Sequence, residues 1–254
     1  MGARLGQHFL HDPSILSRIA AAAAIRAGDL VLVIGPGKGG LTAQLAARAR
    51  RVVAIEADGR LATALAQAFA GRPVEIVHGD ALKAPWPPAE CVCGNIPYQI
   101  TSPLIERALR PPRPRVVVFL VQREVADRLA ALPGSRAYGA LSAGVQLVAT
   151  VERLFGVPRG AFRPAPRVES ALIRITPLQP APLSAEAECA TRALIRAAFQ
   201  RRRQQLRRTV AETAGIPRPA AEALLASVGV PPETRPEMLA PAQFVALAQA
   251  LERL

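Results

Sequence analysis

The sequence predicts an α/β fold in which a seven-stranded, mostly parallel sheet is followed by a small all-α C-terminal domain. Short apolar runs without alternation recur along the first half of the chain, with helix-like stretches between most of them, as expected of strands buried on both faces. These runs cover residues 30–34, 52–55, 74–77, 91–93 and 116–121. Two further runs, 149–157 and 170–176, are separated by a loop too short for a crossover helix, so they are expected to pair antiparallel.

Helix signals flank this strand pattern. Asp12 followed by Pro13 predicts an N-cap and a helix over 13–26 that Gly28 ends. The proline-rich stretch 176–184 suits neither a helix nor a central strand and is predicted to be a linker. Beyond it the chain is helix-like to its end. We therefore expect two domains, residues 1–180 and 181–254.

Composition narrows the functional classes. The 254 residues are 50% hydrophobic, which excludes long disorder and a small disulfide scaffold. Lys and Arg number 32 against 19 Asp and Glu, for a net charge of +13, and only Lys38 and Lys83 are lysines. This excess indicates a polyanionic partner, although an arginine-rich coding bias explains it as well.

Cysteine usage and hydropathy indicate a cytoplasmic protein. Cys91, Cys93 and Cys189 cannot all pair within one chain, and no Cys/His cluster completes a metal site around the first two. The early apolar run 19–25 is too short to span a membrane. The sequence thus predicts no metal, no membrane partner and a reducing compartment.

A glycine-rich turn follows the first strand. Residues 35–40 read GPGKGG, and Glu56 ends the second strand 21 residues after Gly35. Such a turn lets backbone N–H groups approach a ligand, and an acidic side chain at that place can accept both hydroxyls of a ribose. A nucleoside cofactor is expected, either a nicotinamide dinucleotide or S-adenosylmethionine. A glycine turn without a ligand is the alternative.

Polar residues also follow the third and fourth strands. Asp80 can accept from an adenine amino group or cap the next helix. Residues 94–98 read GNIPY, which decides between the cofactors. The Asn95 carbonyl and a backbone carbonyl at Ile96 or Pro97 can accept the two N–H groups of an exocyclic aromatic amine, and Tyr98 offers a flat face to a flipped base.

These motifs resemble the ribosomal RNA adenine N6-dimethyltransferases, most closely the bacterial 16S rRNA branch. Ten blocks match in order, among them LGQHFLHD (residues 5–12), VLVIGPGKGGLT (31–42), VVAIEADGRL (52–61), GNIPYQITSP (94–103) and FRPAPRVESAL (162–172). The resemblance implies a Rossmann-like class I methyltransferase domain that uses S-adenosylmethionine, followed by a helical RNA-recognition domain.

The resemblance also implies residue roles. The implied cofactor-binding residues are His8, Leu10, Gly35, Gly37, Gly39, Glu56, Ala57, Asp80, Ala81 and Asn95. The implied catalytic residues are Asn95, Ile96, Pro97, Tyr98 and Phe162, with Phe162 closing over the target base opposite Tyr98. The chain departs from the family at Val33, where a glutamate is usual, and at Arg208, where an asparagine is common.

Five arginines lie close together near residue 200: Arg201, Arg202, Arg203, Arg207 and Arg208. Read as one helix, Ile195, Phe199, Leu206 and Val210 share an apolar face while the arginines point elsewhere. Because no acid lies among them, RNA phosphate contact is favoured over a solvated face.

The resemblance therefore implies an enzyme that methylates the N6 amines of two adjacent adenosines in small-subunit rRNA within a pre-30S particle, and we expect it to be a monomer. Three alternatives stay open: a 23S rRNA dimethylase giving antibiotic resistance, a non-catalytic RNA-binding assembly factor, and a nicotinamide oxidoreductase. Loss of Asn95 or Glu56 would mark the second, and both are present.

Overall fold

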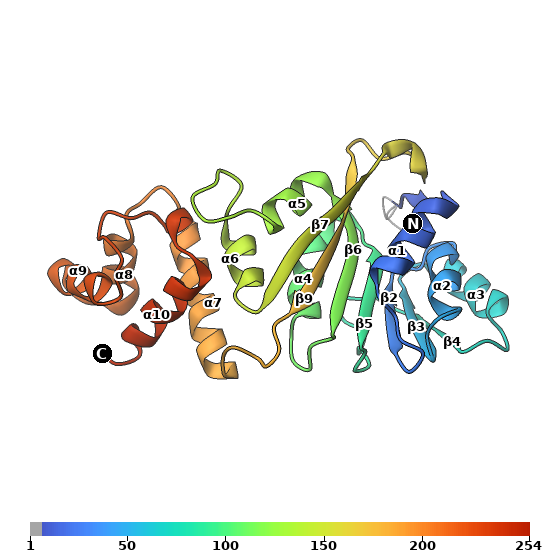
Figure 1. The fold of residues 1–254 in the computed structure, drawn as a ribbon, viewed down its shortest axis with the longest axis horizontal. Helices are drawn as coiled ribbons and strands as arrows, with labels where there is room; N and C mark the ends of the chain where they lie inside the picture. The colour runs from blue at the N-terminus through green and yellow to red at the C-terminus, as the bar shows by residue number, and fades with distance from the viewer. Residues whose placement is uncertain (1–6) are drawn as a thin grey trace. The chain divides into compact units, whose positions relative to one another are not determined.

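A computed structural model describes residues 7–254 of the chain (Figure 1). The chain forms two compact units. The first takes in the described residues up to Ala126 together with Val151–Pro177, and the second consists of Asp127–Thr150 and Leu178–Leu254.

The first unit is built on the predicted seven-stranded sheet, whose order is β4-β3-β2-β5-β6-β9-β7. Its strands are β2 (Leu30–Ile34), β3 (Arg51–Glu56), β4 (Val74–His78), β5 (Cys91–Asn95), β6 (Val116–Gln122), β7 (Ala149–Val157) and β9 (Ser170–Pro177). The five strands from β4 to β6 pair in parallel, and β9 pairs antiparallel with β6. The strand order reverses between β2 and β5, and open sheets bind ligands at the carboxyl side of such a switch point.

Helices follow the strands at the expected places: α1 (Pro13–Ala22), α2 (Gly40–Ala46), α3 (Gly59–Ala68), and α4 (Thr101–Ala108), which comes after a 3-10 turn η1 (Tyr98–Ile100). The predicted cap of the first helix is confirmed, because Asp12 Oδ1 accepts from the N–H groups of Ser14 and Ile15 at 2.9 and 3.2 Å. The helix ends four residues before the predicted position 26. The end is marked by Ala24, whose φ of 45° is left-handed.

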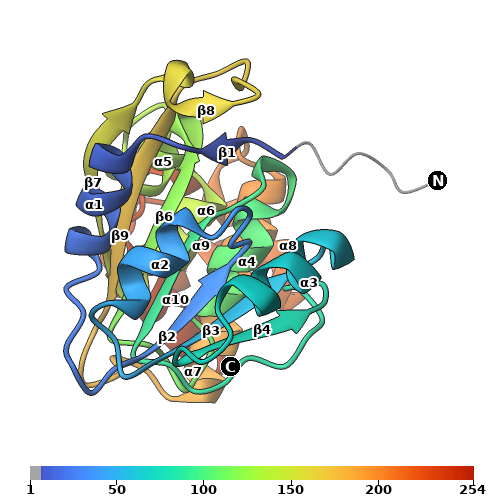
Figure 2. The same cartoon turned by 90° about the vertical axis from the view of Figure 1, so that its right-hand side faces the viewer.

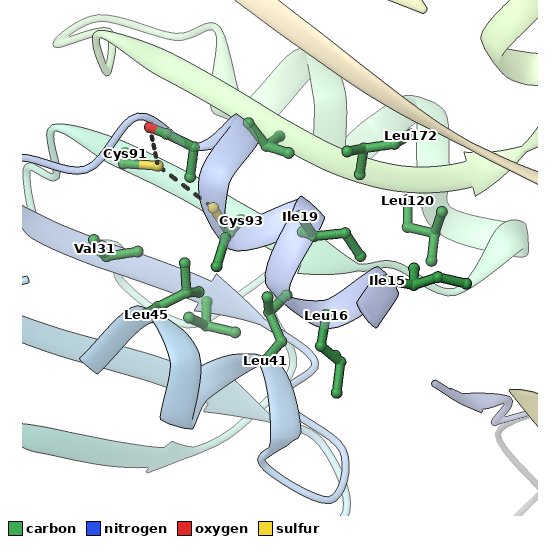
Figure 3. Packing of buried hydrophobic residues seen from close by; sticks show 14 of the residues in the cluster. Ile15, Leu16, Ile19, Val31, Leu41, Leu45, Cys91, Cys93, Leu120 and Leu172 are labelled. Carbon is green, nitrogen blue, oxygen red and sulfur yellow. Dashed lines mark hydrogen bonds between the residues drawn. The ribbon is translucent and has the colours of Figure 1, made fainter. Parts of the chain in front are cut away.

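The core of the first unit lies between α1, α2 and one face of the sheet (Figure 3). Its strand residues alternate, as with Val31 and Val33 on β2. The intervening residues Leu32 and Ile34 are at most 1% exposed, so both sheet faces are covered. Cys91 and Cys93 lie in this core with their sulfur atoms 3.4 Å apart.

A small two-stranded sheet ties the start of the described chain to the loop between β7 and β9 (Figure 2). Strand β1 (Phe9–Leu10) pairs antiparallel with β8 (Phe162–Arg163), and a 3-10 turn η2 (Arg159–Ala161) precedes β8. The His11 N–H donates to the Ala161 carbonyl at 3.0 Å and extends this pairing. Of the first implied family block, residues 5 and 6 lie outside the described residues.

The second unit is helical. Its helices are α6 (Ala140–Gln146), α7 (Ala185–Gln200), α8 (Leu206–Ala214), α9 (Arg218–Ser227) and α10 (Pro241–Leu251), with a 3-10 turn η3 (Pro236–Met238); α5 (Arg123–Leu129) spans the division between the units. The predicted linker has no helix between β9 and α7, and Ser184 caps α7.

The two compact units differ from the predicted domains, which meet near residue 180, in one segment. Asp127–Thr150 was expected in the first domain, but it packs with the C-terminal helices. The buried Tyr138 hydroxyl donates to the Leu239 carbonyl at 2.9 Å, and Gly134 N–H donates to the Glu237 carbonyl at 2.7 Å. These partners are about a hundred residues apart in sequence, so local patterns do not predict them.

Candidate active site

A cavity of about 420 Å³ opens at the carboxyl ends of β2 to β5, within the first unit. That volume lies in the range of small-molecule sites. It is lined by the predicted residues His8, Leu10, Gly35, Gly37, Glu56, Ala57, Asp80, Ala81, Asn95, Ile96, Pro97 and Tyr98. Twelve of the fourteen residues assigned to cofactor and catalysis thus share one site, and Gly39 and Phe162 do not line it.

The glycine turn follows the end of β2. Gly35, Gly37 and Gly39 have φ values of 64°, 58° and 83°, a region that favours glycine. A Cβ on Gly39 would lie 2.8 Å from a methyl carbon of Leu65 on α3. Gly39 therefore permits helix packing behind the turn, whereas Gly35 and Gly37 face the cavity.

Glu56 is the buried carboxylate of the cavity, with 3% of its surface exposed at the end of β3. Its Oε2 accepts from Gly37 N–H and its Oε1 from Asp58 N–H, both at 3.0 Å. Each carboxylate oxygen has about two acceptor positions. One position on each oxygen is thus used to hold the glycine turn and the strand end, which leaves acceptor capacity for a diol.

Asp80 does not cap a helix, because residues 79–90 form turns and loop between β4 and β5, and its role as adenine acceptor stays a prediction. Its Oδ1 accepts from Leu82 N–H at 2.9 Å, which fixes the turn after β4, and the residue also lines the cavity. This turn is supported from α4, because the Arg107 guanidinium donates to the carbonyls of Leu82 and Ala84 and lies 5.0 Å from the centroid of the Trp86 ring.

Asn95 ends β5 and has a fixed amide orientation. Its Nδ2 donates to the His8 carbonyl at 2.8 Å. Because a backbone carbonyl only accepts, the amide must turn its nitrogen toward His8, and its Oδ1 then remains as an acceptor. Strand β5 approaches β2 closely just before this residue, since a Cβ on Gly94 would lie 2.5 Å from the Ile34 carbonyl oxygen.

The loop after Asn95 distinguishes between the Ile96 and Pro97 carbonyls, either of which the sequence allowed as the second acceptor of the amine. The Pro97 carbonyl accepts from Ile100 N–H at 3.2 Å and from the Thr101 hydroxyl at 3.3 Å, so it is engaged in the 3-10 turn. The Ile96 carbonyl precedes that turn. It is the better candidate for the second acceptor.

Tyr98 is half-buried and anchored at its hydroxyl. The Tyr98 Oη and Ser170 Oγ atoms lie 2.8 Å apart, which ties the loop to the first residue of β9. Burial raises the pKa of Tyr98, opposed by the hydrogen bond from Ser170. Ser170 belongs to a sequence block that was recognised without a role, and its pairing with a residue 72 positions away has no local signal.

His8 links three parts of the site. Its ring stacks on Tyr98 with a centroid distance of 6.1 Å and an interplanar angle of 28°. Its Nδ1 lies 2.8 Å from the Pro164 carbonyl and must donate to it, which fixes the position of that proton. His8 thereby connects the start of the chain, the loop at Asn95 and the loop before β9.

Phe162 does not line the cavity. It is 2% exposed and belongs to the core cluster of the first unit, and its closing over the target base opposite Tyr98 stays a prediction. Phe162 pairs with Leu10 and both pack against that cluster, although Leu10 also lines the cavity.

Val33 leaves an apolar wall where the family usually has a glutamate. It is fully buried on β2 and lines the cavity. Lys38 also lines the cavity, with Nζ 5.2 Å from the centroid of the Phe9 ring.

The five arginines near residue 200 do not lie on one helix, which corrects the sequence prediction. Helix α7 ends at Gln200 and α8 begins at Leu206, so Arg201, Arg202 and Arg203 lie in the turn between them. The apolar positions are nevertheless buried or partly buried, because both helices pack their apolar faces. We call Arg201, Arg202, Arg203, Arg207 and Arg208 the junction arginines.

Most junction arginines have carboxylate partners that lie outside residues 201–208. Arg201 and Arg208 both pair with Glu212, Arg202 lies 3.8 Å from Glu237, and Arg207 lies 3.0 Å from Glu222. The argument that these charges need an external anion therefore applies only to Arg203, which has no ion-pair partner among residues 7–254.

Residues 7–254 contain neither a membrane-spanning helix nor a cluster of metal-ligating side chains. None of the helices has the length and apolar character needed to cross a bilayer. No group of three or more metal-ligating side chains was found in residues 7–254.

The fold and the cavity define a class of protein. An antiparallel strand placed between β6 and β7, a glycine turn after β2 and a carboxylate ending β3 characterise the Rossmann-like methyltransferases. The sequence model of the family described as ribosomal RNA adenine dimethylase matches residues 2–253. The chain belongs to that family.

Individual relatives agree. "Ribosomal RNA small subunit methyltransferase A" of Gloeobacter violaceus is 43% identical over 258 residues, covering 98% of this chain and 92% of the relative. The crystal structure of a dimethyladenosine transferase from Plasmodium falciparum has a TM-score of 0.85 at 28% identity, covering 94% and 96% of the two chains. That of the 23S rRNA methyltransferase ErmE has a TM-score of 0.75 at 30% identity, covering 96% and 99%.

Proposed function

We propose that this chain transfers methyl groups from S-adenosylmethionine to the N6 amines of two adjacent adenosines near the 3′ end of small-subunit rRNA, as a step of ribosome biogenesis. The observation that carries the proposal is the fixed amide of Asn95 inside the cavity, because it presents an acceptor where the amine must lie. Curated relatives named as small-subunit methyltransferases support this choice of substrate at 43% and 39% identity. The 23S rRNA enzyme ErmE is similar at 30% identity.

The cavity fits S-adenosylmethionine by its donor and acceptor set. Glu56 would accept from the ribose hydroxyls, Asp80 from the adenine amino group, and the glycine turn would lie against the methionine end with His8 and Leu10. When bound, this cofactor supplies an electrophilic methyl group on a sulfonium. With an apolar wall at Val33, Lys38 is the cationic side chain at the glycine turn, beside the carboxylate of Glu56.

The chain's own residues would prepare the amine. Asn95 Oδ1 accepts one N–H and the Ile96 carbonyl the other, so that nitrogen pyramidalises with its lone pair directed away from both acceptors. Tyr98 stacks on the flipped base, and its anchored hydroxyl keeps the ring in place without a rotational cost at binding. The nitrogen would take the methyl group as the methyl–sulfur bond breaks, which leaves a neutral thioether, and it would then lose one proton to water.

The test uses purified chain, unmethylated small and large ribosomal subunits, and S-adenosylmethionine. Mass spectrometry of nuclease digests should detect N6,N6-dimethyladenosine in the small-subunit RNA alone. Calorimetry should detect binding of S-adenosylmethionine and not of NAD. Methylation confined to the large subunit would support the 23S alternative, and no methylation of either RNA would contradict the proposal.

A further inference from the structure

The loop between β7 and β9 carries three exposed arginines: Arg159, Arg163 and Arg167. Among residues 7–254 none of them has a carboxylate partner; the Arg159 guanidinium donates to the Arg167 carbonyl at 3.3 Å. Glu169, the acid that follows them, pairs with Arg123 at 2.9 Å. We call Arg159, Arg163 and Arg167 the loop arginines.

Pairing of β1 with β8 places Arg163 beside a residue of the cavity wall, and Arg159 and Arg167 lie on the same loop, joined by their own hydrogen bond. Arg163 is the register partner of Phe9, which lines the cavity. Directly opposed residues of an antiparallel pair project to the same side, so Arg163 leaves the ribbon on the side of the Phe9 ring. Lys38 lies over that ring and is exposed, so it adds a fourth positive charge there.

The loop backbone that presents the arginines is anchored. Ala161 and Phe162 are buried in the core cluster, and Pro166 is buried as well. The carbonyls of Ala161 and Pro164 accept from His11 N–H and His8 Nδ1 at 3.0 and 2.8 Å. An anchored backbone that presents guanidinium groups without carboxylate partners suits an anionic ligand, because little ordering of the loop is needed on binding.

We propose that the loop arginines bind RNA phosphates on either side of the adenosine whose base enters the cavity. This inference rests on the proposed function. A base that leaves its stack to enter a cavity brings its own backbone to the entrance, where guanidinium groups recognise phosphate. Since Arg159, Arg163 and Arg167 have no internal carboxylate to give up, each phosphate contact is made without breaking an ion pair.

The experiment replaces all three residues together: Arg159→Gln, Arg163→Gln and Arg167→Gln. Binding to unmethylated small ribosomal subunits is titrated from low to high salt, and S-adenosylmethionine affinity is measured by calorimetry. With about 0.7 to 0.9 in the slope of log K against log salt for each phosphate contact, we expect the slope to fall by about two to three units. Cofactor affinity should equal that of wild type, which also shows that the variant is folded.

A matched control is the variant Arg26→Gln, Arg48→Gln and Arg110→Gln. These exposed arginines belong to the same unit and precede β2, β3 and β6, at the amino ends of the strands and opposite the cavity. The control variant has the same change in net charge as the test variant. Equal slopes for the two triple variants would overturn the inference while leaving the proposed function intact. If wild type fails to methylate the subunit, the proposed function itself is wrong.

Discussion

The cavity and the junction arginines are both polar regions that the sequence singled out, yet their side chains are used differently. In the cavity, Glu56 accepts hydrogen bonds from backbone N–H groups and Asn95 donates one to a backbone carbonyl. These bonds fix the direction of both side chains and leave an acceptor on each. At the junction, Arg201, Arg207 and Arg208 direct their charge into glutamates of the same unit.

The difference is that backbone contacts orient a side chain, whereas ion pairs compete with its ligand. A buried carboxylate bonded to N–H groups remains an acceptor for further donors. A surface arginine paired with a glutamate must exchange that partner for a phosphate, so the net gain from RNA binding is smaller. The predictions below test this contrast, beginning with the cavity.

The largest effect is expected for Asn95→Ala. Loss of the oriented acceptor should lower kcat by about a hundredfold to a thousandfold, the range found when one preorganised hydrogen-bonding group is removed from an active site. S-adenosylmethionine affinity should change little, because Glu56 and the glycine turn remain. Single-turnover methylation of small subunits measures the first and calorimetry the second; wild-type turnover would contradict the mechanism.

A large effect on cofactor affinity is expected for Glu56→Ala. Hydrogen bonds to a charged group contribute about 1.5–3 kcal/mol each, so S-adenosylmethionine should bind at least tenfold more weakly, and RNA binding should be nearly unchanged. Glu75→Ala is the matched control, since Glu75 lies on neighbouring β4 and pairs with Arg51 outside the cavity. Equal losses for cofactor and RNA would count against the assigned role of Glu56.

The sequence predicted the cavity well because its residues follow strands of a parallel sheet. Asn95 and Glu56 end their strands, and Asp80 and Gly35 closely follow theirs. Because the carboxyl ends of parallel strands share one edge of the sheet, these residues come together there whatever conformation the loops adopt. The position of Phe162 outside the cavity lining has a different cause. Its direction depends on register with β1, a strand some 150 residues earlier, and one residue of register decides whether a side chain faces core or solvent.

The junction arginines show which features a local sequence pattern does not predict. A period of 3.6 residues placed Leu206 and Val210 correctly in the core, although the turn after Gln200 interrupts the helix. The partners Glu222 and Glu237 come from later elements, so the sequence run looked uncompensated. Spacing predicts which faces are buried, but not which charges are neutralised by distant residues.

A moderate effect is expected at the junction. Arg203→Gln should lower the salt slope of subunit binding by about 0.7 to 0.9, because Arg203 has no ion-pair partner among residues 7–254. The variant Arg201→Gln, Arg207→Gln and Arg208→Gln should lower it by less than the two to three units that three free contacts give. Glu212→Gln, which releases Arg201 and Arg208, should steepen the slope. If the triple variant loses two units or more, pairing does not weaken these arginines for RNA.

The smallest effect is expected for Tyr138→Phe, which tests whether the second unit depends on an oriented buried bond more than on its surface ion pairs. The variant removes the hydroxyl and leaves the buried Leu239 carbonyl without that donor. A loss of about 1 kcal/mol in the free energy of unfolding is expected, against less for Arg207→Gln, whose ion pair is partly exposed. Urea unfolding at neutral pH compares the two variants.

The pH dependence of the free energy of unfolding tests the burial of the Tyr138 hydroxyl. Burial raises the pKa of Tyr138 from 10.0 to about 12. Because the folded state holds the proton more tightly than the unfolded state, this contribution to stability is complete below about pH 10 and is lost as the pH rises toward about 12. Wild type should therefore lose more stability than Tyr138→Phe over that alkaline interval, and parallel curves for the two proteins would mean that the hydroxyl is not held in a buried, oriented bond.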